Sequence, residues 1–232
     1  MIETTENGLL ILLDKPLGWT SFDAVSKLRN LLKIRKIGHA GTLDPLATGL
    51  LIICAGKMTK RIEEFQGLEK EYEGTLVIGQ TTASYDLEKE PTEAVDITHI
   101  THEIIHRVAT SFLGKIEQIP PAHSSVKVDG KRAYALARKG KEVALKPRSI
   151  EIHEFSVTSI SLPEVNFRVR CSKGTYIRSL AHDFGAALGV GAYLSQLRRT
   201  RIGAFHVEQA DTIDSIKEKA SSLRPQITDA AS

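Results

Sequence analysis

Several features are scarce or missing in this sequence, and each shortage argues against a class of protein. The 2 cysteines, Cys54 and Cys171, lack CxxC spacing, which disfavours a disulfide framework and favours buried thiols in a reducing compartment. No apolar run approaches the roughly 20 residues that a membrane-spanning helix needs, and no basic and apolar leader opens the chain. We therefore expect a cytoplasmic protein that has no membrane partner.

The charged residues are distributed unevenly along the chain. The net charge is only +3, from 31 Lys and Arg against 28 acidic residues. Three zones are basic: 15–40 has six cations against one acid, 127–148 eight against two, and 168–201 seven against one. The stretch 83–106 has one cation against six acids. Each zone alone is compatible with an ordinary solvated face, but three together favour contacts with the phosphates of a nucleic acid.

Periodicity in the first part of the chain predicts alternating strands and helices. A short strand is expected at 9–13, and a helix follows, with Thr20 as N-cap and Asp23 in a capping box. The apolar face of this helix is expected to consist of Phe22, Val25, Leu28 and Leu32. The run 38–49 is dense in Gly, Thr and Pro and is predicted to be a loop, which the buried strand 50–54 follows.

The later part of the chain continues this mixture. We expect a strand with Tyr72, Gly74, Leu76 and Ile78 on one side, a surface loop over 81–95 and a helix near 102–112. Residues 165–171 alternate apolar and polar, which predicts a strand with a cationic row on one face. A helix with Ile177, Leu180, Phe184 and Leu188 inward should end at Gly189. Because there is no regular βαβ rhythm, the fold class is expected to be α+β, and the last twenty or so residues look frayed.

The most informative stretch of the sequence is 38–49, GHAGTLDPLATG. On its own, Asp before Pro with flanking glycines is typical of a tight turn. However, the run resembles the GHxGxLDPxATG signature of the TruB family of pseudouridine synthases. Four other stretches resemble motifs of that family in the same order, together with a closing LRRT: KPLGWTS at 15–21, KEY at 70–72, QIPP with VKVDGKRAY within 118–134, KGTYIRSL at 173–180 and LRRT at 197–200.

The resemblance covers nearly the whole chain and implies a role for individual residues. The signature aspartate of the family is the essential catalytic carboxylate, and here it is Asp44. Tyr72 would stack on the target uridine, and Arg178 would pair with Asp44. A planar guanidinium suits that task because it keeps a carboxylate ionised in a water-poor pocket. Without the motifs, Tyr72 would be interpreted as a core aromatic residue and Arg178 as a surface charge.

The resemblance also implies a set of substrate-binding residues. His39 would support the opened RNA loop, and Tyr176 and Leu197 would line the pocket. The remaining members of the set are basic: Lys15, Lys127, Lys131 and Arg132. No cofactor and no metal are implied, because the isomerisation breaks one glycosidic bond and makes another without redox change or an external group. A carboxylate can attack C6 of the base, attack C1′ of the ribose or remove a 2′ proton, and these routes stay open.

The family resemblance further implies a substrate and an organisation of the chain. The expected substrate is uridine-55 in the T-loop of the tRNA T-arm, reached by flipping the base out of its stack. The expected fold is that of the pseudouridine synthases, with a mixed, mainly antiparallel sheet flanked by helices. We expect a catalytic domain at 1–212 with a thumb-like basic insertion at about 121–148, and a tail at 213–232 that is too short for a complete PUA domain. We expect a monomer that acts without guide RNA.

Two functions from other classes compete with this interpretation. His102, Glu103 and His106 match the HExxH pattern of zinc proteases, in which both histidines bind zinc. The pattern is short, however, and the sequence offers no convincing third ligand. The second rival is a noncatalytic RNA-binding module, which would need the same basic zones but not the charge of Asp44.

Overall fold

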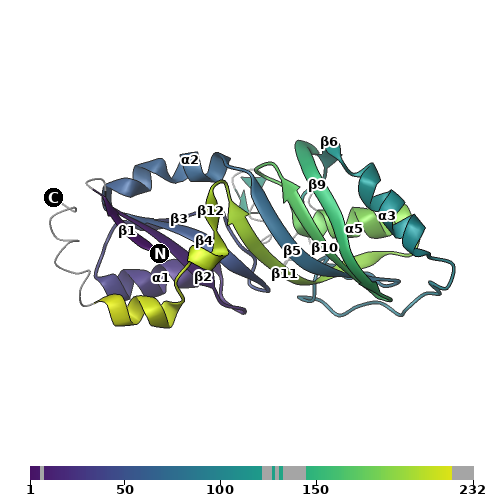
Figure 1. Ribbon diagram of the computed structural model, residues 1–232, viewed down its shortest axis with the longest axis horizontal. Coiled ribbons are helices and arrows are strands. Elements are labelled where there is room, and N and C mark those ends of the chain that lie inside the picture. Colours follow the sequence, from purple (N-terminus) through teal and green to yellow (C-terminus); the bar gives the residue numbers. More distant parts are fainter. Residues whose placement is uncertain (6–7, 122–126, 129–130, 133–144, 221–232) are drawn as a thin grey trace. The chain divides into compact units, whose positions relative to one another are not determined.

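The computed structural model describes residues 1–5, 8–121, 127–128, 131–132 and 145–220. They divide into two compact units, one formed by 1–72 with 197–232 and the other by 73–196. The division falls within two strands, β5 (Lys70–Ile78) and β11 (Ala192–Ile202). Figure 1 labels the main helices and strands of both units.

The first unit is built on β4 (Ala47–Ala55), whose burial is nearly complete. Its antiparallel neighbours are β2 (Gly8–Lys15) and β3 (Ile37–Ala40), and Leu197–Arg199 of β11 pair with Ala47–Gly49 in parallel. β1 (Ile2–Thr5) extends the sheet beside β2, and β12 (Phe205–His206) pairs with β11. Three short helical elements complete this unit: η1 (Gly56–Arg61), α2 (Ile62–Gly67) and η2 (Val207–Gln209).

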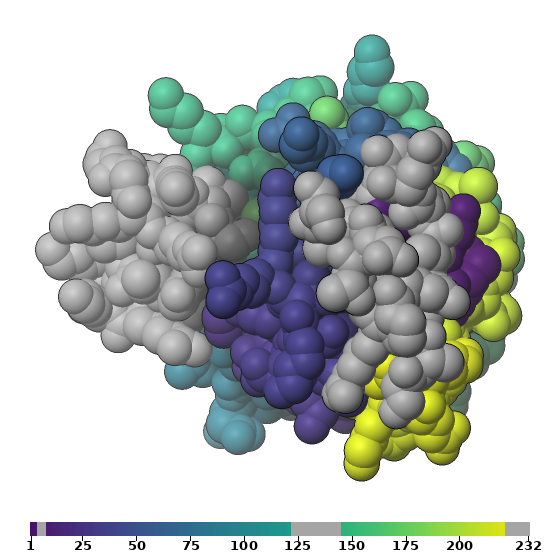
Figure 2. Space-filling view, turned by 90° about the vertical axis from the view of Figure 1, so that its left-hand side faces the viewer, coloured from purple at the N-terminus to yellow at the C-terminus, as the bar shows by residue number. Residues whose placement is uncertain are grey.

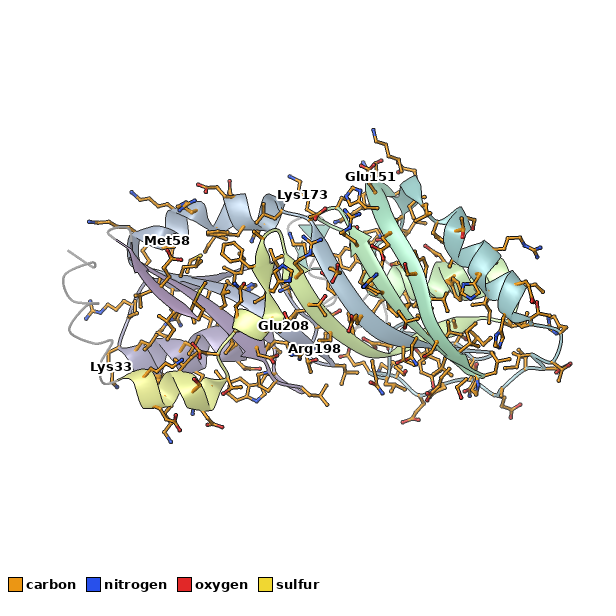
Figure 3. The ribbon with its side chains drawn as sticks, viewed as in Figure 1. Lys33, Met58, Glu151, Lys173, Arg198 and Glu208 are labelled. Carbon is orange, nitrogen blue, oxygen red and sulfur yellow. The ribbon has the colours of Figure 1, made fainter. Side chains whose placement is uncertain are left out.

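Helix α1 (Ser21–Leu32) covers one face of this sheet. The predicted capping box is confirmed, because Thr20 Oγ1 accepts a hydrogen bond from Asp23 N and Asp23 Oδ2 accepts one from Thr20 N. The helix ends at Lys33, which takes a left-handed φ of 59° and is labelled in Figure 3. Val25, Leu28 and Leu32 face the core as predicted, whereas Phe22 was predicted to do so but is 67% exposed, because it lies at the edge of the apolar stripe and Ala24 is buried in its place.

The last described residues belong to the core of the first unit. Residues 213–220 are helical, and Ile216 and Ala220 are buried in the same apolar cluster as α1. Figures 1 and 2 show these residues (yellow) beside α1 (dark purple to blue). The prediction that the chain end is frayed is therefore wrong for 213–220, because this stretch supplies apolar side chains that the face of α1 requires. Residues 221–232 lie outside the described residues.

In the second unit the strand order is β11, β5, β10, β9, β6. β10 (Glu164–Cys171) pairs antiparallel with β9 (Arg148–Ser161), which in turn pairs with β6 (Gly114–Gln118). Helices α3 (His102–Ser111) and α5 (Ile177–Leu188) belong to this unit, and Phe184 of α5 packs against Phe155 of β9. A two-stranded sheet joins β7 (Lys127–Val128) to β8 (Lys131–Arg132).

The predicted elements of the second unit are largely confirmed. β10 buries alternate residues as expected, and α5 buries Ile177, Leu180, Phe184 and Leu188 before ending at Gly189 with a φ of 78°. The mixture of strands and helices confirms the α+β class. The expectation of a surface loop over 81–95 is wrong at Thr82, Ser84 and Asp86, which are at most 5% exposed. The sequence also allows a short helix at 133–139, before Gly140, and this stretch lies outside the described residues.

Candidate active site

Asp44 lies on a short loop between β3 and β4 that the first unit holds by its main chain. Ser21 Oγ, at the start of α1, accepts a hydrogen bond from Leu43 N at 2.8 Å and donates one to Leu43 O at 3.2 Å. On the other side of Asp44, Pro45 O accepts a hydrogen bond from Gly18 N at 2.8 Å, and Ala47 N donates to Asp44 O. The two residues that flank the carboxylate are therefore fixed. The predicted loop over 38–49 is shorter in the structure, because its ends pair as β3 and β4.

The guanidinium of Arg199 also holds the Asp44 loop by its main chain. Arg199 is 1% exposed, and its nitrogens donate to Leu50 O at 2.8 Å, Gly41 O at 3.2 Å and Thr42 O at 3.4 Å. Carbonyls on both sides of Asp44 thus share one planar donor group. Strands β4 and β11 approach each other closely at this point. A Cβ at Gly49 of β4, where φ is 102°, would meet the carbonyl oxygen of Arg199 of β11 at 2.4 Å. The sequence motif LRRT gave no sign of this role for Arg199.

Lys15 is buried beside this loop. Its side chain is 0% exposed, and Nζ donates to Trp19 O at 2.6 Å and to Pro16 O at 3.0 Å. Burial lowers the pKa of Lys15 to about 8, the charge of Asp44 opposes that change, and the charge of Arg199 adds to it. The electrostatic interaction with Asp44 and the two carbonyl contacts favour a role in holding and balancing the Asp44 loop over the direct substrate contact expected for Lys15.

The other predicted residues of the first unit surround the loop or lie on adjoining strands. His39, in β3, precedes the loop, and burial followed by the charge of Arg199 lowers its pKa, so a neutral imidazole is favoured. Leu197 pairs in register with Ala47, at the end of the Asp44 loop. Tyr72, in β5, is 8% exposed and ends the stretch 1–72 of the first unit.

In the second unit, Arg178 is 4% exposed and not the surface charge that it would be without the motifs. Its Nε lies 3.6 Å from Asp86 Oδ2, and Nη1 donates to Ser84 O at 3.2 Å. Asp86 is 5% exposed and also accepts a hydrogen bond on Oδ1 from Glu88 N. Sequence reasoning missed Asp86, because it lies within an acidic, polar stretch that is typical of a solvated loop. The predicted pair between Arg178 and Asp44 joins different units and stays a prediction.

Tyr176 caps the start of α5 and is held from two directions. The amide of Gln118, which is 0% exposed, donates to Tyr176 O at 3.1 Å and accepts from Tyr176 N at 2.8 Å. The guanidinium of Arg148 lies 5.3 Å from the centre of the Tyr176 ring. Gln118 is the last residue of β6 and Arg148 the first of β9, so the two strands that flank the insertion expected at about 121–148 both contact Tyr176.

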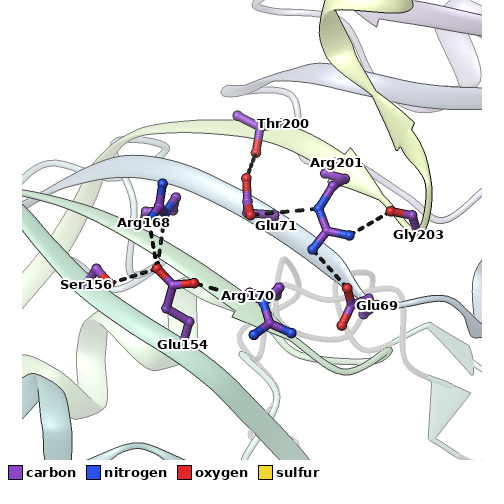
Figure 4. A network of polar contacts seen from close by, with 9 residues as sticks. All are labelled: Glu69, Glu71, Glu154, Ser156, Arg168, Arg170, Thr200, Arg201 and Gly203. Carbon is purple, nitrogen blue, oxygen red and sulfur yellow. Dashed lines mark hydrogen bonds and ion pairs between the residues drawn. The ribbon is translucent and has the colours of Figure 1, made fainter.

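The basic residues of the two later zones differ in how far acids neutralise them. In β10, Arg168 Nη2 lies 2.8 Å from Glu154 Oε1 and Arg170 Nε lies 4.0 Å from Glu154 Oε2 (Figure 4). In the first unit, Arg201 pairs with Glu69 at 2.8 Å, and Arg198, labelled in Figure 3, pairs with Asp14 at 2.7 Å. The cationic row is therefore partly compensated within the protein. Lys127 in β7 pairs in register with Arg132 in β8, next to Lys131.

The zinc-protease pattern lies at the start of α3, where His102, Glu103 and His106 are all exposed. Within the described residues no group of three or more His, Cys, Asp or Glu side chains comes together to hold a metal ion. No described helix has the length and apolar character that crossing a membrane requires. Cys54 and Cys171 are both buried, as predicted, and burial raises the pKa of Cys54 to about 12.

Two family models match adjoining parts of the chain. The N-terminal domain of TruB family pseudouridylate synthases matches residues 29–177, and the C-terminal domain of tRNA pseudouridylate synthase B matches 178–230. Neither these bounds nor the two compact units coincide with the predicted boundary at 212, which stays a prediction.

Curated relatives are similar over almost their whole length. A protein named tRNA pseudouridine synthase B from Flavobacterium johnsoniae is 54% identical over 91% of this chain and 95% of its own. One of the same name from Phocaeicola vulgatus is 52% identical over 92% and 93%. Among solved structures, a chain from a Cbf5-Nop10-Gar1 complex gives a TM-score of 0.73 at 32% identity, covering 97% of this chain and 59% of that chain.

Proposed function

The chain belongs to the TruB family of pseudouridylate synthases and is a tRNA pseudouridine synthase, and we propose that it isomerises uridine-55 in the tRNA T-loop with Asp44 as catalytic carboxylate. The observation that carries the assignment is the fixed loop around Asp44. Ser21 and Arg199 hold the main chain before Asp44, and Arg199 also holds Leu50 after it, while the buried ammonium of Lys15 acts on the charge of Asp44. A loop fixed in this way holds the Asp44 carboxylate in one position, as a catalytic group requires.

In the proposed reaction the target base leaves its stack before any bond changes. Extrusion costs a few kcal/mol, and stacking on an aromatic ring worth about 1 to 3 kcal/mol offsets it. We assign that ring to Tyr72. Asp44 then acts at C6, at C1′ or on the 2′ proton, and all three routes require it to be ionised. We assign Arg178 to pair with Asp44, and a guanidinium that is already ordered by Asp86 and Ser84 is suited to this role.

Asp44→Asn tests the catalytic assignment directly. Purified protein is incubated with an unmodified tRNA transcript, and pseudouridine is mapped chemically. We expect the wild type to modify position 55 and Asp44→Asn to form no pseudouridine, while the dissociation constant for tRNA rises less than about tenfold, because one neutralised side chain leaves the phosphate contacts in place. Asp214→Asn, an exposed residue of the same unit, is the matched control and should behave as wild type.

The same experiment separates the competing functions. A noncatalytic RNA-binding module would bind the transcript without modifying it in the wild type. Full activity in Asp44→Asn, or equal loss of binding and activity, would reject the catalytic role. Modification at a position other than 55 would leave Asp44 in place but overturn the proposed substrate.

We further propose that the enzyme acts as a monomer in the cytoplasm, without guide RNA. The two curated tRNA pseudouridine synthases B are 52–54% identical to this chain, whereas the chain from the Cbf5-Nop10-Gar1 complex, a multi-protein assembly, is 32% identical. Protein freed of bound RNA by nuclease treatment should still modify the transcript. Light scattering should give the mass of one subunit per particle. A requirement for added RNA would overturn it.

A further inference from the structure

Tyr85 has an unusual backbone conformation next to the Asp86–Arg178 pair. Its φ is 65°, and among the described residues other than glycine only Lys33, a helix C-cap, shares a positive φ. The left-handed region is unfavourable for a residue with a side chain, so the surroundings must hold Tyr85 there.

The main chain around Tyr85 is tightly hydrogen-bonded. Tyr85 N donates to Thr82 O at 3.2 Å, and Tyr85 O accepts from Leu194 N at 2.9 Å. The next carbonyl, Asp86 O, accepts from Thr82 Oγ1 at 2.7 Å and from Ser84 Oγ at 3.0 Å. These bonds form the turn, and the turn directs the Asp86 carboxylate towards Arg178.

The Tyr85 ring supplies a contact that the turn itself does not need. It stacks on His182 with ring centres 4.1 Å apart and an angle of 17° between the planes. His182 follows Arg178 by four residues on α5, so both side chains lie on one face of the helix. The segment 84–86 therefore contacts this face twice, through the Arg178 guanidinium and through the His182 ring.

We propose that the Tyr85–His182 stack is a positioning device for catalysis, which fixes the turn against α5 so that Asp86 and Ser84 O hold the Arg178 guanidinium in its working orientation. The proposal rests on the proposed function, in which Arg178 pairs with the catalytic carboxylate. Neither ring is assigned to touch the substrate. Sequence reasoning missed the pair, because Tyr85 lies in a polar, acidic stretch and His182 lies outside the motif 173–180.

The alternative is that the stack is ordinary packing that stabilises the fold without affecting the reaction. Tyr85→Gly separates these possibilities, because glycine relaxes the left-handed backbone but removes the ring. We expect Tyr85→Gly to unfold at a temperature close to that of the wild type and yet to react about five- to tenfold more slowly in single turnover at saturating tRNA. Tyr85→Ala, which keeps the strain, should be both slower and less stable.

Conservative variants and a double-mutant cycle complete the experiment. Tyr85→Phe and His182→Phe keep a stack and should retain at least half of the wild-type rate. His182→Ala should lower the rate about as much as Tyr85→Ala. The double variant with both alanines should be little slower than either single variant. The tRNA dissociation constant should change less than twofold in all of them. His153→Ala, a histidine on β9 of the same unit, is the matched control and should react at the wild-type rate.

The outcomes are decisive in each direction. Wild-type single-turnover rates in folded Tyr85→Gly and His182→Ala would overturn the positioning role, as would losses that simply add in the double variant. A wild type that forms no pseudouridine would instead count against the proposed function itself, so failures of the two proposals can be told apart.

Discussion

Among single residues, Lys15 combines complete burial with a charge, and this has a measurable consequence. Its pKa is lowered from an ordinary value near 10.5 to about 8, chiefly by burial. Below pH 8 the lysine is charged in both the folded and the unfolded state. Between pH 8 and 10.5 the folded state releases the proton first, so the contribution of Lys15 to stability becomes more favourable as pH rises through this window.

We predict that this window disappears in Lys15→Met. The free energy of unfolding in urea is measured at pH 7 and at pH 9.5. From the lower to the higher pH, the wild type should gain roughly 1 to 2 kcal/mol of stability relative to Lys15→Met. Lys27→Met, an exposed lysine on α1, should show no such difference. A constant gap between wild type and Lys15→Met at both pH values would contradict the assigned pKa.

At the scale of single elements, α1 connects the fold to the candidate site. The capping box of Thr20 and Asp23 begins the helix, and the next residue, Ser21, contacts Leu43 on the Asp44 loop. Thr20→Ala removes the acceptor for Asp23 N, so we predict a loss of about 1 kcal/mol in the free energy of unfolding. Thr20→Ser keeps that acceptor and should stay within about 0.5 kcal/mol of the wild type. Equal urea midpoints for the two variants would show that the cap contributes nothing.

The elements that sequence reasoning placed well are those with a long, simple pattern. α5 and β10 follow helical and alternating periodicity to within a few residues. The pattern of α1 was also found, but Phe22 was assigned to the wrong face, because a residue in the first turn lies close to the edge of the apolar stripe. Short strands such as β3 are harder to predict, since the four residues Ile37–Ala40 carry too little periodicity to separate them from a loop.

The candidate site was predictable to the extent that motifs named its residues. Motifs identified Asp44, Tyr72 and Arg178, but they did not show that Arg199 holds the Asp44 loop or that Asp86 pairs with Arg178. Both contacts join residues that are far apart in sequence. Asp86, Thr82 and Ser84 are polar and buried through mutual hydrogen bonds, and from the sequence alone such a segment is indistinguishable from a solvated loop.

At the scale of the whole molecule, binding to RNA depends on which basic residues are available to phosphates. Arg168 and Arg170 share Glu154, and Arg201 lies between Glu69 and Glu71 (Figure 4). These arginines are already compensated within the protein, so they should release fewer counterions on binding than their number suggests. The zone 127–148 has eight cations against two acids, and its residues Lys127, Lys131 and Arg132 lie on the β7–β8 pair.

We predict that this basic pair of strands dominates the salt dependence of tRNA binding. Each lost phosphate contact lowers the slope of log K against log salt by about 0.9. Replacing Lys127, Lys131 and Arg132 together by Ala should therefore lower the slope by about 2 to 3, with a much smaller effect on the single-turnover rate at saturating tRNA. Lys57→Ala with Lys60→Ala removes exposed charge outside the three basic zones and should change the slope by less than about 0.5. Equal slopes for the triple variant and the wild type would mean that the phosphates are bound elsewhere, and the basic residues of α1 and of 33–36 would then be the next set to test.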